Sequence, residues 1–139
     1  MKIEALKSKD GIERLRLLKH RGTGILECSF DTCTREEGRE LLVQLVARLQ
    51  KEAAASVILL IGTQGAVHDA AQGNEWKRHL ELFDSRLKKS AIYGLAPMHR
   101  IALAGLRMYA RLIGREKAAL QARVFDSRDA ALEYLVSGK

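Results

Sequence analysis

The chain has 139 residues, of which 47% are hydrophobic and 29% are charged, so its length and composition exclude wholesale disorder and predict one folded domain. It contains no uninterrupted apolar run of about 18 residues and no recognisable secretory signal, so we expect no transmembrane segment and a cytoplasmic location. The formal net charge is +7, and most of the excess lies between Asp84 and Arg115, where seven Lys or Arg residues accompany one Asp.

The first predicted elements are two strands. Residues 15–20 and 24–30 are short apolar-rich runs joined by a three-residue segment that contains Gly22, a pattern typical of an antiparallel hairpin. The apolar residues of the second run do not alternate regularly, so the pattern leaves the pairing register open. We assign residues 1–11 to an N-terminal extension and residues 12–139 to the domain.

A helix is predicted to follow the hairpin. Thr34 and Glu37 have the spacing of a capping box, in which the hydroxyl and the carboxylate each accept a backbone N–H at the start of a helix. Apolar residues then recur at helical spacing: Leu41, Leu42, Leu45, Val46 and Leu49. Residues 56–61, which read S-V-I-L-L-I, predict a central strand covered on both faces.

The next segment has a weaker helical pattern. Its apolar positions are Trp76, Leu80, Phe83 and Leu87. Gly73 and Asn74 are expected to mark a break or a cap in this helical region. A second internal strand is predicted at residues 91–94.

Pro97 fixes the backbone for a helix that starts near Met98 and stops at Gly114. At 100° per residue, one side of this helix is apolar and carries Ile101, Gly105, Tyr109, Leu112 and Ile113. Three arginines lie within about 40° of one another on the opposite side: Arg100, Arg107 and Arg111. We therefore expect a sharply two-faced helix.

The chain is predicted to close with a strand at residues 122–125 and a helix that Asp126 or Ser127 caps. Ala131, Leu132 and Leu135 are placed to dock that helix on the core. Strands that alternate with helices favour parallel pairing. The predicted fold is therefore a single α/β domain with a mostly parallel central sheet, an N-terminal antiparallel hairpin and flanking helices.

Two phrases in the second half of the chain resemble a known family. S-A-I-Y-G at residues 90–94 precedes a helix, and a strand that ends in Phe125-Asp126 precedes a helix that ends in Tyr134-Leu135. This order resembles the SpoIIAA-like branch of the STAS domain family, over about residues 15–135. The resemblance implies a SpoIIAA-like fold and a bacterial, non-catalytic regulatory or binding module.

In anti-sigma factor antagonists of that family, the loop after the central strand carries a phosphorylated serine that follows an aspartate. Here the loop reads G-T-Q-G-A-V-H-D, and Thr63 is its only hydroxyl. A phosphate at this helix entrance would meet favourable backbone N–H groups. The alternative is that Thr63 only satisfies hydrogen bonds of the turn.

No catalytic or metal-binding constellation is recognisable in the sequence. The loop lacks the Gly-Lys-Ser/Thr of a nucleotide-binding P-loop, and His68 stands beside Asp69 without a nucleophile in context. The other histidines are isolated, and the C-x4-C pair of Cys28 and Cys33 lacks further ligands for zinc. We expect no enzymatic activity, no cofactor, no metal and two reduced thiols.

Two surfaces are candidates for binding. One is the edge where parallel strands end, with Thr63, Gln64, His68, Tyr93 and His99. The other is the basic surface of Arg100, Arg107 and Arg111, which has few aromatics for base stacking and so does not favour specific nucleic acid. The expected partner is a protein, with a small lipid-like or anionic ligand near Trp76, Phe83 and Tyr93 as the alternative. A homodimer remains open.

Overall fold

The computed structural model describes residues 6–7, 13–67, 70–114 and 122–137. Its strands are β1 (Leu6–Lys7), β2 (Glu13–His20), β3 (Thr23–Ser29), β4 (Val57–Gly62), β5 (Leu87–Tyr93) and β6 (Ala122–Phe125). Its helices are α1 (Arg35–Gln50), α2 (Ala70–Arg78), α3 (Leu80–Arg86), α4 (Pro97–Leu112) and α6 (Arg128–Val136). No helix in the described ranges has the length and apolar character needed to cross a membrane.

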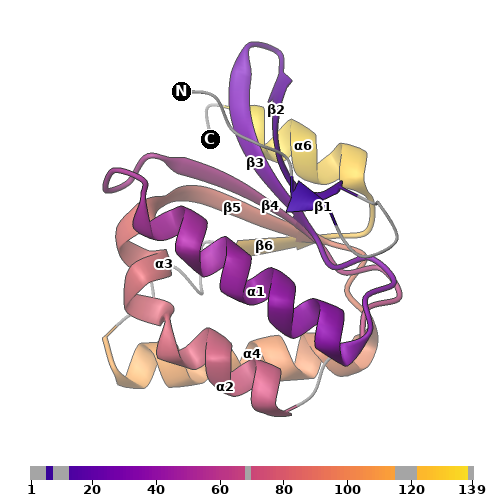
Figure 1. Cartoon of the computed structure of the whole chain (residues 1–139), viewed down its shortest axis with the longest axis vertical. Coiled ribbons are helices and arrows are strands. Elements are labelled where there is room, and N and C mark those ends of the chain that lie inside the picture. The colour runs from indigo at the N-terminus through magenta and orange to yellow at the C-terminus, as the bar shows by residue number, and fades with distance from the viewer. Residues whose placement is uncertain (1–5, 8–12, 68–69, 115–121, 138–139) are drawn as a thin grey trace.

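The strands form one sheet in the order β1-β2-β3-β4-β5-β6 (Figure 1). β1, β2 and β3 pair antiparallel, and β3 to β6 pair parallel. This arrangement confirms the predicted α/β class, with its antiparallel start and its mostly parallel remainder. β1 lies within the stretch assigned to the N-terminal extension, where it pairs with the edge of the sheet.

The predicted hairpin is confirmed, and its register is set by a two-residue turn. Arg21 and Gly22 both have positive φ angles, of 50° and 80°, as a type I′ turn requires. His20 consequently pairs with Thr23, and Leu15 pairs with Cys28. The irregular apolar pattern of β3 has a physical reason, since both of its faces are covered between Ile25 and Cys28.

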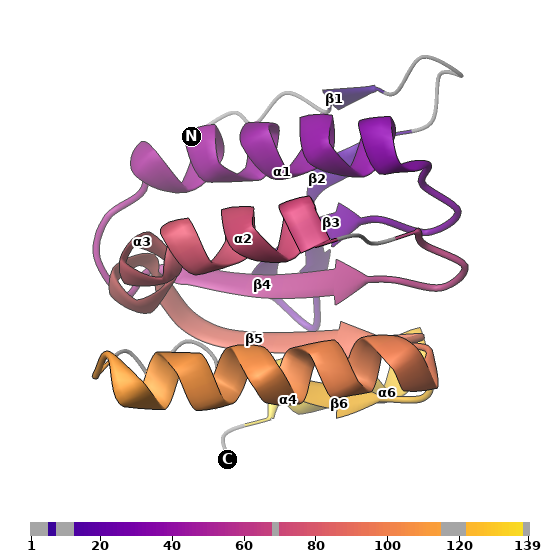
Figure 2. The same cartoon turned by 90° about the horizontal axis from the view of Figure 1, so that it is seen from below.

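Helices cover both faces of the sheet (Figures 1 and 2). On one face, α1 and α3 pack over the odd-numbered residues of β4, including Leu59. On the other face, α6 packs over Leu60. Because strand side chains alternate between faces and neither leucine is exposed, β4 is the predicted central strand.

The region between β4 and α4 differs from prediction at two points. Leu87 starts β5, so the strand begins four residues before the predicted position and Leu87 is not helical. The apolar pattern did not predict this start because Lys88 and Lys89 are charged. Lys88 is exposed, and the Lys89 ammonium donates to the carbonyl oxygens of Tyr134 and Ser137, at 2.6 and 2.9 Å. Lys89 thus supplies donors for the C-terminal end of α6.

Gly73 and Asn74 were wrongly predicted to interrupt the helical region. They lie inside α2, and the break falls at His79, between α2 and α3. Tertiary packing explains the continuous helix, because the Trp76 ring stacks on Phe83 with centroids 5.0 Å apart and anchors α2 to the core. A surface glycine costs a helix only about 1 kcal/mol, which such packing offsets.

Candidate functional site

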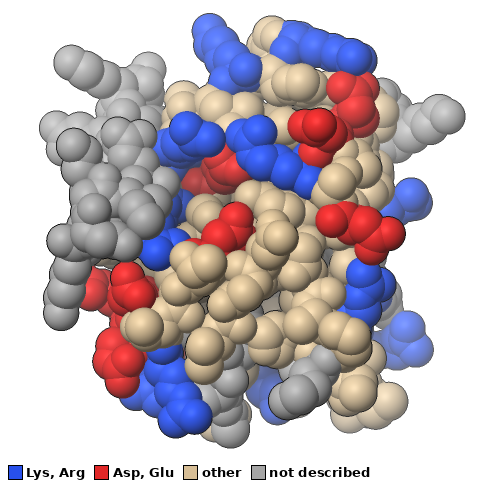
Figure 3. All heavy atoms as spheres, turned by 90° about the vertical axis from the view of Figure 1, so that its right-hand side faces the viewer, with Lys and Arg blue, Asp and Glu red and all other residues tan. Residues whose placement is uncertain are grey.

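The parallel strands β3, β4, β5 and β6 all end at one edge of the sheet, which Figure 3 views from outside. Charged side chains of both signs lie on this face around an uncharged area in its lower half (Figure 3). The exposed, uncharged residues here include Gln64, Gly65, Val67 and Ala96 of the adjoining loops and Pro97 at the start of α4. The described part of this edge is therefore mixed in character.

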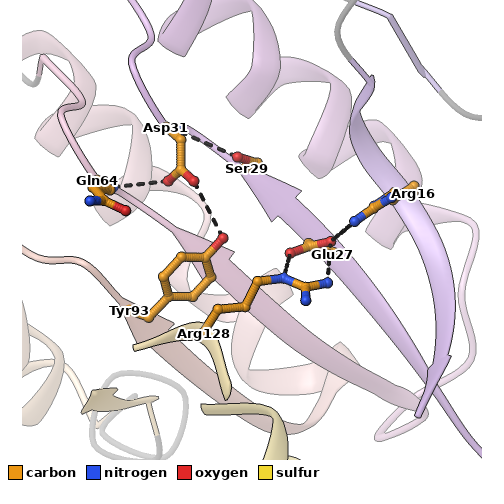
Figure 4. A network of polar contacts seen from close by, with 7 residues as sticks. All are labelled: Arg16, Glu27, Ser29, Asp31, Gln64, Tyr93 and Arg128. Carbon is orange, nitrogen blue, oxygen red and sulfur yellow. Dashed lines mark hydrogen bonds and ion pairs between the residues drawn. The ribbon is translucent and has the colours of Figure 1, made fainter. Parts of the chain in front are cut away.

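Three of the predicted site residues meet at this edge. Both the backbone N–H and the hydroxyl of Thr63 donate to the carbonyl oxygen of Tyr93, at 3.1 and 3.0 Å. The backbone N–H of Gln64 donates to a carboxylate oxygen of Asp31 at 2.9 Å. The Tyr93 hydroxyl donates to the other carboxylate oxygen of Asp31, at 3.4 Å (Figure 4).

Thr63 is buried, and its hydroxyl is engaged inside the protein. A phosphate on this oxygen would have to break the bond to Tyr93 and enter a closed space. The geometry therefore favours the structural interpretation of Thr63, which ties the loop after β4 to the end of β5.

Asp31 is the member of this group that sequence reasoning missed. Its carboxylate accepts from Gln64 and Tyr93, and its carbonyl oxygen accepts from the buried Arg14 guanidinium at 2.6 Å. Burial, together with the negative charge of Asp31, raises the pKa of Tyr93, so the phenol stays protonated and acts as a donor. The available signal was an Asp directly after the end of a strand, where parallel strands converge.

A second polar group lies beside the first, on the face of the sheet that α6 covers (Figure 4). The carboxylate of Glu27 in β3 is buried, and it accepts from Arg16 of β2 at 2.9 Å and from Arg128 of α6 at 2.8 and 3.2 Å. Burial raises the pKa of Glu27, but the hydrogen bonds and charges of Arg128 and Arg16 outweigh it and hold the pKa below its usual value. This group fastens α6 to the hairpin.

Two glycines let these loops pack closely. A Cβ on Gly62 would lie 2.5 Å from the Tyr93 hydroxyl oxygen. A Cβ on Gly94, whose φ is +77°, would lie 2.9 Å from Gln64 Cβ and 3.1 Å from its backbone. A side chain at Gly62 would have to displace the ends of the Tyr93 and Asp31 side chains, and one at Gly94 would press on the Gln64 backbone.

Gly94→Ala is expected to lower the free energy of unfolding by about 1 to 3 kcal/mol, because alanine disfavours a positive φ and would meet the Gln64 backbone. Urea unfolding measures the change. The matched control is Gly73→Ala, which lies in α2 with no atom near its new Cβ and should raise stability by about 0.5 to 1 kcal/mol. Equal effects of the two substitutions would contradict the proposed close contact.

The other predicted site residues that the structure describes lie on α4. His68 lies outside the described residues. His99 is half-buried in the first turn of α4. Arg100 donates to the carbonyl oxygen of Leu95 at 3.3 Å and to Asp126 at 3.2 Å, so it joins the start of α4 to the end of β6.

The aromatic residues considered for a ligand pocket lie on opposite faces of the sheet. Trp76 and Phe83 pack in the cluster beneath α1, with Phe30. Tyr93 belongs to the cluster beneath α6. These three rings therefore do not line a common pocket.

The side of α4 that faces solvent is its apolar side. Ile101, Met108 and Leu112 are 75%, 67% and 81% exposed. Ala104 and Gly105, also exposed, lie between them. We call these five residues the α4 stripe.

The opposite side of α4 packs on the protein. Ala110 and Leu106 contact Leu80 of α3, and Leu103 packs on the hydrophobic cluster beneath α1. α4 also lies against α2, at the lower margin of the molecule in Figure 1. Arg100, Arg107 and Arg111 do not lie directly opposite the α4 stripe but at its border, between the stripe and the packed side, and Arg107 is half-buried there. A helix normally buries its apolar side, so the α4 stripe is an unusual feature.

Comparison with models of protein families, with curated proteins and with solved structures finds no match to this chain. In the part of the chain that the structure describes, no three His, Cys, Asp or Glu side chains gather where they could hold a metal ion. The packing of the fold does not explain the exposure of the α4 stripe.

Proposed function

We propose that this protein is a non-catalytic binding or regulatory module of the STAS type, and that it acts by contact between the α4 stripe and another protein. The observation that carries the proposal is the exposure of Ile101, Met108 and Leu112 along one side of a helix that packs on the protein through Leu103, Leu106 and Ala110. Large apolar side chains gathered on one exposed face are typical of a protein interface.

The internal polar groups support a scaffold role for the strand edge. Hydrogen bonds join Asp31 to Tyr93 and Thr63 to the Tyr93 carbonyl oxygen, and these bonds hold the loops in place. Hydrogen bonds between Glu27 and Arg128 hold α6 in place. The antiparallel start, the parallel remainder and the end of β5 at S-A-I-Y fit the resemblance to the SpoIIAA-like branch. That resemblance supports a regulatory role within bacterial cells.

A photo-crosslinking amino acid at Met108 tests the proposal in the native cells. We expect a covalent adduct with another protein, and we expect Ile101→Ser together with Leu112→Ser to abolish it. Those two substitutions should change the free energy of unfolding by less than about 0.5 kcal/mol, because both side chains are already exposed.

The matched control places the same crosslinker at Val43, which is 65% exposed on α1. Its adducts should differ from those at Met108 and should be insensitive to the α4 substitutions. Absence of adducts at Met108, or the same adducts at both positions, would count against the proposed function.

A further inference from the structure

We propose that the protein partner binds the α4 stripe with an amphipathic helix whose borders are acidic. This inference rests on the proposed function, and it adds the chemistry of the partner. Three observations support it: large and small side chains alternate along the α4 stripe, basic residues border it, and these charges disfavour a second copy of the chain as the occupant.

The α4 stripe has the alternation of large and small side chains that is typical of a helix-packing surface. Large side chains stand at Ile101, Met108 and Leu112, and the small residues Ala104 and Gly105 lie between them. A Cβ on Gly105 would meet no atom within 4 Å, so a partner's side chain can approach the α4 backbone there. With 16 residues, α4 is about 24 Å long, enough to pack along several turns of a second helix.

Positive charge borders the α4 stripe on both sides. Arg100, Arg107 and Arg111 follow one border, where Arg100 is paired with Asp126, and α4 itself contains no Asp or Glu. Tyr109 lies on the other border, and the Lys77 ammonium of α2 is 5.2 Å from the centre of its ring. A helix that packs its apolar side on the α4 stripe is therefore complementary when Asp or Glu residues flank that side.

The same charges disfavour a second copy of this chain as the occupant. Antiparallel pairing of α4 with its own copy about a two-fold axis would align the arginine borders of the two copies. Parallel pairing would set the arginines of each copy against the side that carries Lys77. Like charges meet in both arrangements, and such contacts oppose association.

An anionic membrane is also less well matched. The α4 stripe contains neither Trp nor Phe and offers three large apolar side chains. Interfacial helices depend on a broader apolar face together with uniform positive charge.

Three fluorescent peptides test the inference by anisotropy with the full chain. Each is an amphipathic helix of about five turns with the same leucine face, and its border positions are all Glu, all Gln or all Lys. We expect the Glu peptide to bind about tenfold more tightly than the Lys peptide at low salt, because a few solvated Arg–carboxylate pairs each contribute a fraction of a kcal/mol. High salt should reduce the difference.

Variants assign the binding to its residues. Ile101→Ser with Leu112→Ser should abolish binding of all three peptides, whereas Val43→Ser should leave it unchanged. Arg100→Gln, Arg107→Gln and Arg111→Gln together should remove most of the preference for Glu and leave the Gln peptide bound. Circular dichroism confirms that each variant is folded.

Several results would overturn the inference. They are equal or tighter binding of the Lys peptide, no binding of any peptide, and stripe-dependent binding to phosphatidylserine vesicles in place of the Glu peptide. Stripe-dependent dimerisation in sedimentation would instead identify a second copy as the occupant. The crosslink at Met108 separates the two proposals: if it forms and the peptides show no preference for Glu, only the acidic partner is rejected.

Discussion

Replacement of Arg16 and Arg128 by Met in one variant is expected to lower the free energy of unfolding at pH 7 by about 3 kcal/mol. Both guanidinium groups bond the buried carboxylate of Glu27, and the variant leaves that charge without its cationic partners. The expected value is at the lower end for an uncompensated buried charge, because the two arginines are partly exposed and water can reach their positions.

The pH dependence identifies the cause. In the native protein the pKa of Glu27 lies below its usual value of 4.5, so its stabilising contribution is present above pH 4.5 and is lost as the pH falls through the lowered pKa. In the variant the two arginines no longer lower the pKa of Glu27, whereas burial still raises it. The folded-state pKa of Glu27 therefore rises above 4.5. The carboxyl then favours the folded state most at low pH, and this contribution is lost as the pH rises through the raised pKa.

The stability difference between the native protein and the variant should therefore shrink as the pH is lowered from 7 towards 4. Urea unfolding at several pH values measures it. Arg21→Met is the control, because the ion pair of Arg21 with Glu133 is solvent-exposed and should contribute less than about 1 kcal/mol. A difference that stays constant with pH would show that Glu27 is not the group responsible.

Leu59→Ala is expected to lower the free energy of unfolding by about 2 to 5 kcal/mol. Leu59 is fully buried in β4, beneath the helices of the α1 face, so truncation removes apolar contacts and leaves a cavity that the packed layers cannot easily fill. Denaturant titration followed by circular dichroism measures the loss.

Val43→Ala is the matched control for this prediction. Val43 is apolar but 65% exposed on α1, so its truncation should change stability by less than about 0.5 kcal/mol. A change below about 1 kcal/mol for Leu59→Ala would contradict its place at the centre of the sheet.

Much of the fold could be predicted because the signals are local. The capping box at Thr34 is present, with Glu37 Oε1 3.1 Å from the Thr34 N–H. The run that contains Leu59 and Leu60 is buried on both faces, and Pro97 starts α4 as expected. In each case a few neighbouring residues determine the conformation through hydrogen bonding, backbone restriction or burial.

The start of β5 and the continuity of α2 could not be read in this way. Lys89 is a charged residue inside a buried strand, which the sequence pattern does not predict. Its ammonium bonds carbonyl groups more than 40 residues away, at the C-terminal end of α6. Gly73 suggested a break, but the packing of Trp76 on Phe83 keeps α2 helical. Such contacts join residues that the sequence pattern treats as independent.

The sequence by itself determined the α/β class, the two-faced character of α4 and the concentration of basic residues there. Only the tertiary structure decided which side of α4 faces solvent, because helical periodicity shows that Ile101 and Leu112 share a side but not what covers it. The contacts of Leu103, Leu106 and Ala110 use the other side. They leave exposed the α4 stripe, the surface on which we propose that a partner binds.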